Sequence, residues 1–377
     1  MQILKARKSV NDYLVSPLRF VRFLVTTSCR AVVLPRFGGP EVLEVRPNVE
    51  VPDLKPNEVL VRTRAVSINP LDTRMRSGYG RSIFEPLLPL ILGRDISGEV
   101  AAVGASVRSL TVGQEVFGAL HPTAVRGTYA DYAVLSEDEL TPKPVSVTHA
   151  DASAIPFAAL TAWRALKCAA RMSEGQRLLV LGGGGAVGFA AVQFSVASGC
   201  HVSATCGSKS IDRVLAAGAE QAVDYSSKDI ELAIKGKFDA VLDTIGAPET
   251  EILGLNFLKR GGHYMTLHGE TAALADHYGL ALGLPIATTV LLKKRMQTWY
   301  SYGIGDKPVW PLTEEARDYS YIYMRADAEG LEEIRRLSET GKLKIPVDKT
   351  FHMTQVREAH EAKDKRLIPG KVVLEFD

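Results

Sequence analysis

The pattern of apolar and polar residues changes near residue 150, and this change divides the chain into two parts. Before it, short stretches alternate between apolar and polar positions and end at glycine or proline. Short alternating stretches rich in β-branched residues are typical of strands, so this part predicts a compact, barrel-like β domain. The clearest predicted strands are residues 30–34, 57–67, 96–104, 112–118 and 127–134.

After residue 150, continuous apolar runs alternate with alanine-rich or amphipathic segments. The runs fit strands buried on both faces and the segments between them fit helices, which together predict a doubly wound parallel sheet. Helices are predicted at residues 150–170 and 211–217. The predicted strands are residues 178–181, 202–205, 218–225, 238–243 and 262–267.

The C-terminal residues are predicted to return to the first domain. Residues 331–338 have the pattern of an amphipathic helix, and residues 371–376 that of a final strand. The predicted fold is therefore α/β with two domains and an active site in the cleft between them. The predicted domains are residues 29–155, completed by residues 310–377, and residues 156–309.

A glycine-rich segment joins the first strand of the second part to its first helix. It reads Leu178-Leu-Val-Leu-Gly-Gly-Gly-Gly-Ala-Val-Gly188 and fits G-x-G-x-x-G, which between a strand and a helix indicates dinucleotide binding. Residues without a Cβ let the backbone approach a pyrophosphate, whose charge the helix N-terminus stabilises. A loose turn would also explain the glycines alone. The predicted cofactor contacts are Gly183, Gly185, Ala186, Val187 and Gly188.

The end of the second strand of this sheet predicts the type of nicotinamide cofactor. NAD-specific folds place an acidic residue there to bind the ribose 2′-hydroxyl. The segment Thr205-Cys-Gly-Ser-Lys-Ser210 has no acid, and Ser208 and Lys209 can hydrogen-bond to a 2′-phosphate. This favours NADPH, although a solvated loop with an incidental lysine remains the alternative.

Composition excludes several classes of protein. A net charge of +2 over 377 residues gives no reason to expect nucleic-acid binding. Four cysteines without C-x-x-C spacing do not form a disulfide framework. No apolar run is long enough for a transmembrane segment. The longest, residues 280–292, contains Gly283 and Pro285 and predicts a core or interface segment.

The first 28 residues differ in composition from the rest. They contain five lysines and arginines but one acidic residue, Asp12, together with serine and threonine. Their apolar residues are scattered, unlike those of a secretory signal. This composition predicts a mitochondrial transit peptide, and the matrix as the compartment, with a disordered basic tail as the alternative.

Several short motifs occur in a specific order and spacing. They are Asn69-Pro-Leu-Asp72, Arg76-Ser-Gly-Tyr-Gly80, Leu92-Gly-Arg-Asp-Ile-Ser-Gly98, Ala159-Leu-Thr-Ala-Trp163, the glycine loop, Gly218-Ala and Val223-Asp-Tyr225. With these motifs the chain resembles the medium-chain dehydrogenase/reductase superfamily, in its zinc-free quinone-oxidoreductase-like branch, over nearly the whole chain after residue 30. The resemblance implies a GroES-like β-barrel domain, a Rossmann domain, and NADPH-dependent reduction of quinones or conjugated carbonyls.

The resemblance also implies positions for several site residues. Asn69 and Asp72 would line the nicotinamide cleft, Thr161 would face the cofactor, and Tyr225 would lie against the adenosine. Asp72 could equally have a structural role in its loop, and Tyr225 could be an ordinary aromatic at a strand end. Ligands bind at the carboxyl ends of strands in such sheets, which adds Gly246, Leu267 and His268 to the predicted site.

Tyr79 is the candidate proton donor. Enoyl reductases of this superfamily carry a proton-donating tyrosine in the matching loop, although the loop is one residue shorter in this chain. Many quinone reductases of the branch have a tyrosine two residues after the position of Asp72, where this chain has Arg74. Solvent remains the alternative donor.

A zinc site is not expected. Zinc-containing members of the superfamily carry cysteine at the position of Asn69 and histidine at that of Arg94, and neither residue of this chain is a zinc ligand. Without a metal to polarise an alcohol, the reduction of an electrophilic acceptor is the expected chemistry.

Three functions stay open. The first is a mitochondrial NADPH-dependent reductase of a small-molecule quinone or enone. The second is an enoyl-thioester or alkenal reductase on the same scaffold. The third is a non-enzymatic NADPH-binding partner in the assembly of other mitochondrial proteins. A homodimer and mitochondrial protein partners are compatible with each of them.

Overall fold

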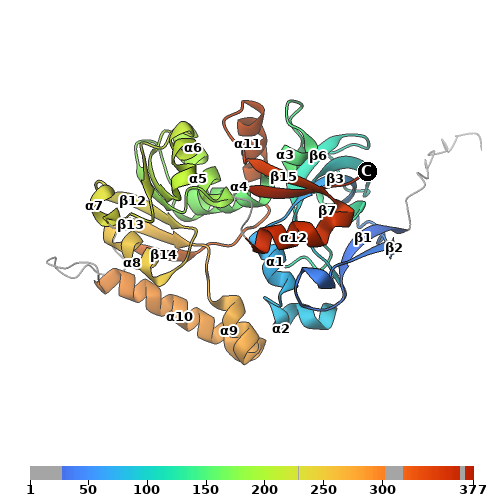
Figure 1. Cartoon of the computed structure of the whole chain (residues 1–377), viewed down its shortest axis with the longest axis horizontal. Helices are drawn as coiled ribbons and strands as arrows, with labels where there is room; N and C mark the ends of the chain where they lie inside the picture. Colours follow the sequence, from blue (N-terminus) through green and yellow to red (C-terminus); the bar gives the residue numbers. More distant parts are fainter. Residues whose placement is uncertain (1–27, 228, 302–316, 366–369) are drawn as a thin grey trace, which may run out of the picture.

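The structure is a computed structural model that describes residues 28–227, 229–301, 317–365 and 370–377. Figure 1 shows two halves side by side, with β1 and the C-terminal end of the chain in the same half. The predicted transit peptide lies outside the described residues, except for its last position.

Two sheets build the first half of the molecule. The strand order is β15-β16-β3-β5-β6-β8 in the larger sheet, where β7 also pairs with β3, and β2-β1-β4 in the smaller one. Buried branched residues from β3 and β5, such as Val59, Val61 and Ile96, contribute to one core beneath both sheets. The strands are β1 (Ser28–Leu34), β2 (Glu44–Glu50), β3 (Glu58–Ser67), β4 (Leu90–Ile91), β5 (Asp95–Val103), β6 (Glu115–Ala119), β7 (Tyr132–Ser136), β8 (Leu140–Pro142), β15 (Val347–His352) and β16 (Lys371–Glu375).

A six-stranded parallel sheet forms the second half. Its order is β11-β10-β9-β12-β13-β14, so the direction of strand addition reverses beside β9. Such a reversal opens a crevice at the carboxyl ends of the strands, where ligands bind. The predicted α/β class, with a barrel-like part and a doubly wound sheet, is confirmed. The strands are β9 (Arg177–Leu181), β10 (His201–Cys206), β11 (Gln221–Asp224), β12 (Phe238–Asp243), β13 (Leu258–Thr266) and β14 (Asp318–Tyr321).

Helices cover both sheets and connect the halves. Residues 150–170 do not form one helix, because Pro156 lacks an amide hydrogen and begins a new helix, α4, after α3. The helices are α1 (Pro70–Arg76), α2 (Arg81–Phe84), α3 (His149–Ser153), α4 (Pro156–Trp163), the π-helical turn η4 (Arg164–Ala169), α5 (Ala186–Ala197), α6 (Ile211–Ala216), α7 (Ile230–Ala233), α8 (Pro248–Phe257), α9 (Thr271–Tyr278), α10 (Leu280–Ser301), α11 (Ala328–Glu339) and α12 (Val356–Asp364).

The C-terminal residues are divided between the two halves. Strand β16 pairs with β3 in the first half, with Leu374 opposite Val66. Strand β14, in contrast, pairs with β13 at the edge of the parallel sheet. The predicted boundary at residue 310 therefore differs from the structure, because residues 318–321 belong to the second sheet.

The apolar stretch at 280–292 is helical and lies at the surface, so it is not a core segment. It forms the first part of α10, which packs with α9 along the lower edge of the molecule in Figure 1. Gly283 and Ala287 are buried on its inner face, whereas Leu282 and Leu292 are exposed. None of the helices in the described part of the chain is long and apolar enough to span a membrane.

His360 on α12 predicts a dependence of stability on pH. Its side chain is fully buried, and burial, aided by the charge of Arg76, lowers its pKa to about 3. The unfolded chain takes up a proton below about pH 6.5 that the folded protein does not bind, so stability falls as the pH decreases through this range. We expect the free energy of unfolding to fall by about 2 kcal/mol less in His360→Gln than in the parent between pH 7 and pH 5.

Urea denaturation of both proteins at the two pH values measures this difference. The pKa of buried Asp72 is raised to about 6, which works in the opposite direction, but Asp72 is present in both proteins and its effect cancels. An identical pH dependence in parent and variant would contradict the prediction.

Candidate functional site

The glycine loop lies between β9 and α5, at the point where the strand order reverses. Gly182 has a positive φ of 93°, and a Cβ on Gly188 would lie 2.3 Å from the carbonyl oxygen of Gly182. Both glycines are therefore required by the fold of the loop itself. A Cβ on Gly185 would come no closer than 3.5 Å to another atom, and Gly185 lines the cleft. Its missing side chain leaves room for a ligand at the N-terminus of α5.

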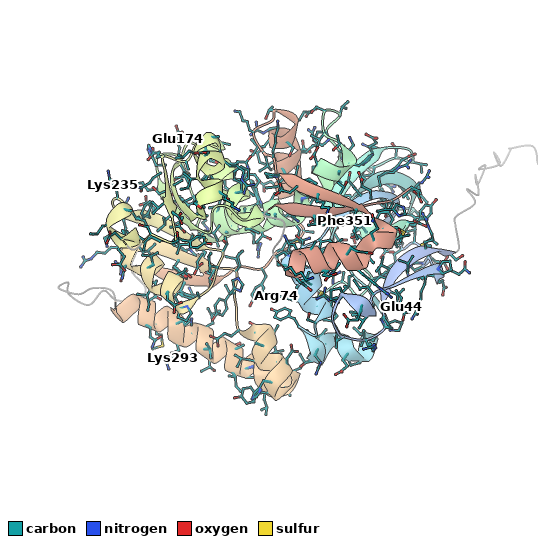
Figure 2. The ribbon with its side chains drawn as sticks, viewed as in Figure 1. Glu44, Arg74, Glu174, Lys235, Lys293 and Phe351 are labelled. Carbon is teal, nitrogen blue, oxygen red and sulfur yellow. The ribbon has the colours of Figure 1, made fainter. Side chains whose placement is uncertain are left out.

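One cleft of about 710 Å³ joins this loop to the first half of the molecule. Of the predicted site residues, it is lined by Asn69, Tyr79, Thr161, Gly185, Ala186, Val187, Gly188, Leu267 and His268. Arg74, which also lines it, projects into the space between the two halves in Figure 2. The structure therefore brings together residues that are up to 200 positions apart in the sequence.

The remaining predicted cofactor residues lie around this cleft and do not line it. Ser208 and Lys209 are exposed on the turn after β10. The exposed ring of Tyr225 lies beside Gly207, where a Cβ would be 3.5 Å from the ring. Gly246, with a φ of 73°, lies against the side chain of His268. Because it has no Cβ, the loops after β12 and β13 can approach each other here. Tyr225 and Gly207 lie side by side and suit the walls of a binding site for the adenosine of a cofactor.

Arg213 on α6 is a cleft residue that the sequence analysis missed. Its Nη2 donates a hydrogen bond of 2.9 Å to the carbonyl oxygen of Gly184 in the glycine loop. Its guanidinium also lies over the ring of Phe189, 5.2 Å from the centroid. The Nε atom is buried without a hydrogen-bond partner, which fits a ligand acceptor at this place. The signal in the sequence was a cation one helical turn after Lys209.

The opposite end of the cleft is built around Asn69, which is 2% exposed. Its Nδ2 donates to Asp95 at 2.8 Å, and its Oδ1 accepts from Lys371 Nζ at 2.7 Å. Lys371 also contacts Asp95 at 3.1 Å and lines the cleft. Asp95 in turn accepts from the backbone N–H of Phe157 at the start of α4. This buried cluster holds the Asn69 amide and links the first half of the molecule to α4.

The structure places Asp72 behind this cluster rather than in the cleft. Its carboxylate accepts hydrogen bonds from the backbone N–H of Asn69 at 2.7 Å and of Gly93 at 3.2 Å. Burial raises its pKa, and the nearby Arg94 opposes that rise. Asp72 therefore caps α1 and positions Asn69, and this geometry does not support its predicted part in catalysis.

Tyr79 lines the cleft from a loop between Gly78 and Gly80, whose φ values are 101° and 76°. The loop is held from the other half, because Asp276 on α9 accepts from the backbone N–H of Gly80 at 2.8 Å and of Ser82 at 2.9 Å. Partial burial raises the pKa of Tyr79, so its hydroxyl keeps its proton at neutral pH.

His268 and Lys363 are two further titratable residues of the cleft lining. Arg74 Nη2 lies 3.4 Å from His268 Nδ1 across the two halves, and burial lowers the pKa of His268. The neutral imidazole can therefore accept this hydrogen bond. Lys363, which also lines the cleft, has a pKa lowered to about 8 by burial and by the charge of Lys371.

The position that zinc-containing members use for a ligand holds a structural arginine. Arg94 is fully buried, and its guanidinium donates to the backbone carbonyls of Gly93, Pro122 and Ala124. Within the ranges that the structure describes, no group of three histidine, cysteine or acidic side chains could hold a metal ion.

A nicotinamide dinucleotide fits the residues that are present. The glycine loop and the N-terminus of α5 suit a pyrophosphate, Gly207 and Tyr225 suit adenosine, and Arg213 offers an unused donor. Thr161 suits the nicotinamide end, because its hydroxyl, fixed by donation to the Phe157 carbonyl at 2.7 Å, remains at the cleft wall.

Comparison with known proteins agrees with this arrangement. Residues 55–145 match the family described as alcohol dehydrogenase GroES-like domain, and residues 217–374 match the family described as zinc-binding dehydrogenase. The quinone oxidoreductase from Coxiella burnetii superposes with a TM-score of 0.74 at 26% identity, over 92% of this chain and 99% of that one.

Curated relatives match almost the full length of the chain. The protein named NAD(P)H oxidoreductase RTN4IP1, mitochondrial, from Bos taurus is 34% identical over 94% of this chain and 92% of its own length. Reticulon-4-interacting protein 1, mitochondrial, from Caenorhabditis elegans is 30% identical over 94% and 98%. The chain therefore belongs to the medium-chain dehydrogenase/reductase superfamily and, within it, to the NAD(P)H oxidoreductases of the RTN4IP1 type.

Proposed function

We propose that the protein is a metal-independent, NADPH-dependent reductase of quinones or conjugated carbonyls that acts in the mitochondrial matrix. The observation that carries this proposal is that the glycine loop and the Asn69–Tyr79 end line one continuous cleft. The names of the relatives support a nicotinamide cofactor and a mitochondrial location, and the Coxiella burnetii structure supports a quinone acceptor.

Residues in and around the cleft have distinct parts in this proposal. When bound, the cofactor supplies a hydride to carbon. The backbone of residues 183–188 holds the pyrophosphate, while Ser208, Lys209 and Arg213 hold the 2′-phosphate. Thr161, Leu267 and His268 orient the nicotinamide end. The acceptor lies between that end and Tyr79, whose hydroxyl donates a proton to the acceptor oxygen as that oxygen gains charge.

The side chains at two positions support metal independence. An amide and a guanidinium, those of Asn69 and Arg94, stand where zinc-containing members of the superfamily carry cysteine and histidine, and neither group is a zinc ligand. Incubation of the purified protein with NADPH and a panel of quinones, enones and enoyl-thioesters, with and without a chelator, tests the proposal. It is overturned if no acceptor is reduced, or if the chelator abolishes the activity.

A reductase of enones or alkenals is the second candidate. A Solanum lycopersicum protein named 2-methylene-furan-3-one reductase is 34% identical over 62% of this chain and 60% of its own length. Faster turnover of enones or enoyl-thioesters than of quinones would favour this candidate. Binding of NADPH without turnover of any acceptor would favour an assembly role with mitochondrial protein partners, alone or as a homodimer.

NADPH is expected to bind at least tenfold more tightly than NADH, which corresponds to about 1.4 kcal/mol. The reason is the cationic group around the turn after β10, where an acid would be needed to select NADH. Titration by nicotinamide fluorescence measures both affinities. Arg213→Ala and Lys209→Ala should each reduce the ratio, because a hydrogen bond between a cation and phosphate contributes about 1.5–3 kcal/mol.

The two variants separate the roles of these cations. Arg213 lines the cleft and Lys209 is exposed, so we expect the larger loss of NADPH affinity in Arg213→Ala. Lys167→Ala, which removes a lysine outside the cleft lining, is the control and should leave both affinities unchanged. Equal affinities of the parent for NADPH and NADH would refute the assignment.

Tyr79→Phe keeps the ring and removes the proton. We expect kcat on weakly electrophilic enones to fall by about 10² to 10⁴-fold, the usual contribution of a general acid. On simple quinones the loss should stay below about tenfold, because the reduced anion is already stable. Steady-state kinetics on both acceptor classes measures the contrast, and unchanged rates on both would assign the proton to water.

A further inference from the structure

The cleft is lined by cations and by no acid. Its lining includes Arg74, Arg213, Lys363 and Lys371, whereas no aspartate or glutamate lines it within the described ranges of the chain. A cavity whose charges have one sign attracts ligands of the opposite sign. The phosphates of a nicotinamide dinucleotide would use some of these cations, and the others are available to the acceptor.

Three of the four cations are already engaged. Lys371 contacts buried Asp95 at 3.1 Å, and Arg213 donates to a backbone carbonyl of the glycine loop. Lys363 Nζ lies 3.4 Å from the carbonyl oxygen of Gly370, and burial, together with the charge of Lys371, lowers the pKa of Lys363 to about 8. The charges of these three cations are thus balanced by an acid, used by the loop or weakened by burial.

Arg74 differs from the other three, because it keeps its charge and has no acidic partner among the described residues. Its Nη2 lies 3.4 Å from Nδ1 of His268, and burial lowers the pKa of that imidazole, which is therefore neutral at pH 7. A neutral ring accepts a hydrogen bond but does not balance a positive charge. The guanidinium projects into the space between the two halves (Figure 2), and its other N–H groups are available to a ligand there.

A backbone hydrogen bond fixes Arg74 beside Tyr79, the proposed proton donor. The backbone N–H of Tyr79 donates to the carbonyl oxygen of Arg74 at 2.9 Å, and both side chains line the cleft. Burial raises the pKa of Tyr79, and the positive charge of Arg74 opposes that rise, so the charge acts at the hydroxyl. An acceptor that contacts the Tyr79 hydroxyl therefore lies close to the guanidinium as well.

We propose that Arg74 binds a carboxylate carried by the acceptor, and that the substrate is an acidic quinone or enone. The proposal rests on the proposed function for the reacting end and adds a substituent to its acceptor. A planar guanidinium pairs with a carboxylate through two parallel hydrogen bonds, which fix the orientation of the acceptor as well as its position. The carbonyl oxygen of the acceptor then lies beside Tyr79, while Arg74 determines specificity and takes no part in proton transfer.

The test compares two enones that share one skeleton, benzylideneacetone with a para-carboxylate and the methyl ester of the same compound. We expect kcat/KM of the parent to be at least about tenfold higher for the acid, mainly through KM, because the ester offers no charge to the guanidinium. Arg74→Met should abolish this preference, and Arg74→Lys, which keeps the charge without the planar fork, should retain part of it. Arg81→Met removes a cation outside the cleft lining and should leave the preference unchanged.

Calorimetric titration of the protein loaded with NADP⁺ separates this inference from the proposed function, because the oxidised cofactor cannot reduce either enone. A parent that reduces neither enone but binds the acid more tightly, in a manner lost in Arg74→Met, supports the carboxylate site and overturns the reductase. A parent that reduces both enones but binds the acid no better than the ester overturns the carboxylate site and leaves the reductase intact. A preference that survives in Arg74→Met also overturns the site. So does a loss of NADPH affinity of about tenfold or more in that variant, which would assign Arg74 to the cofactor.

Discussion

Replacing Gly185 with valine is expected to weaken NADPH binding at least about 100-fold, or about 2.7 kcal/mol, while the protein stays folded. The backbone of Gly185, with φ −78° and ψ 161°, is in the extended region that valine also adopts. An added Cβ would meet only one atom within 4 Å, at 3.5 Å. The branched side chain therefore fills the cleft in front of α5 without disturbing the loop, and it excludes the pyrophosphate.

Gly188→Val is the informative comparison. Its Cβ would collide with the backbone of Gly182 and Gly183. We therefore expect this variant to bind NADPH weakly and also to have a lower melting temperature than the parent. Fluorescence titration with NADPH and thermal denaturation of both variants measure the contrast. Undiminished NADPH affinity in Gly185→Val would show that the pyrophosphate does not bind at this loop.

Lys371→Met is expected to lower the free energy of unfolding by about 3–5 kcal/mol, the usual cost of leaving a buried charge without its partner. Asp95 is completely buried, and Lys371 is the cation within 3.1 Å of its carboxylate. Methionine has a similar length and no charge, so the packing of the site is largely kept. The Asn69 amide oxygen also loses the hydrogen bond from Lys371, so the Asn69 side chain should be held less firmly at this end of the cleft.

A second substitution separates the charge effect from a loss of packing. In the double variant Lys371→Met with Asp95→Asn both charges of this pair are removed, so neither is left without its partner, and we expect it to recover at least half of the lost stability. Chemical denaturation of the parent, of Lys371→Met and Asp95→Asn alone, and of the double variant measures these differences. If the double variant is as unstable as the sum of the single variants, the pair makes no stabilising interaction and the prediction is wrong.

The elements that local patterns predict best are those with one dominant physical cause. Strand β9 is a continuous apolar run because both of its faces are buried, and the glycines after it follow from close backbone contacts. Pattern and cause are both local, so the sequence predicted the strand, the loop and the helix that follows. Helix α10 was less clear, because Gly283 and Pro285 are common helix breakers, and only the contact of Gly283 with α9 explains the glycine.

The sequence by itself determined the two-part α/β organisation, the glycine loop and the missing acid after β10. Each of these depends on patterns within short segments of the chain. Only the tertiary structure decided that Lys371 holds Asn69, that Arg213 reaches the glycine loop and that α9 closes over the Tyr79 loop. These contacts join residues up to about 300 positions apart, and they are set by the packing of the two halves, which no local periodicity records.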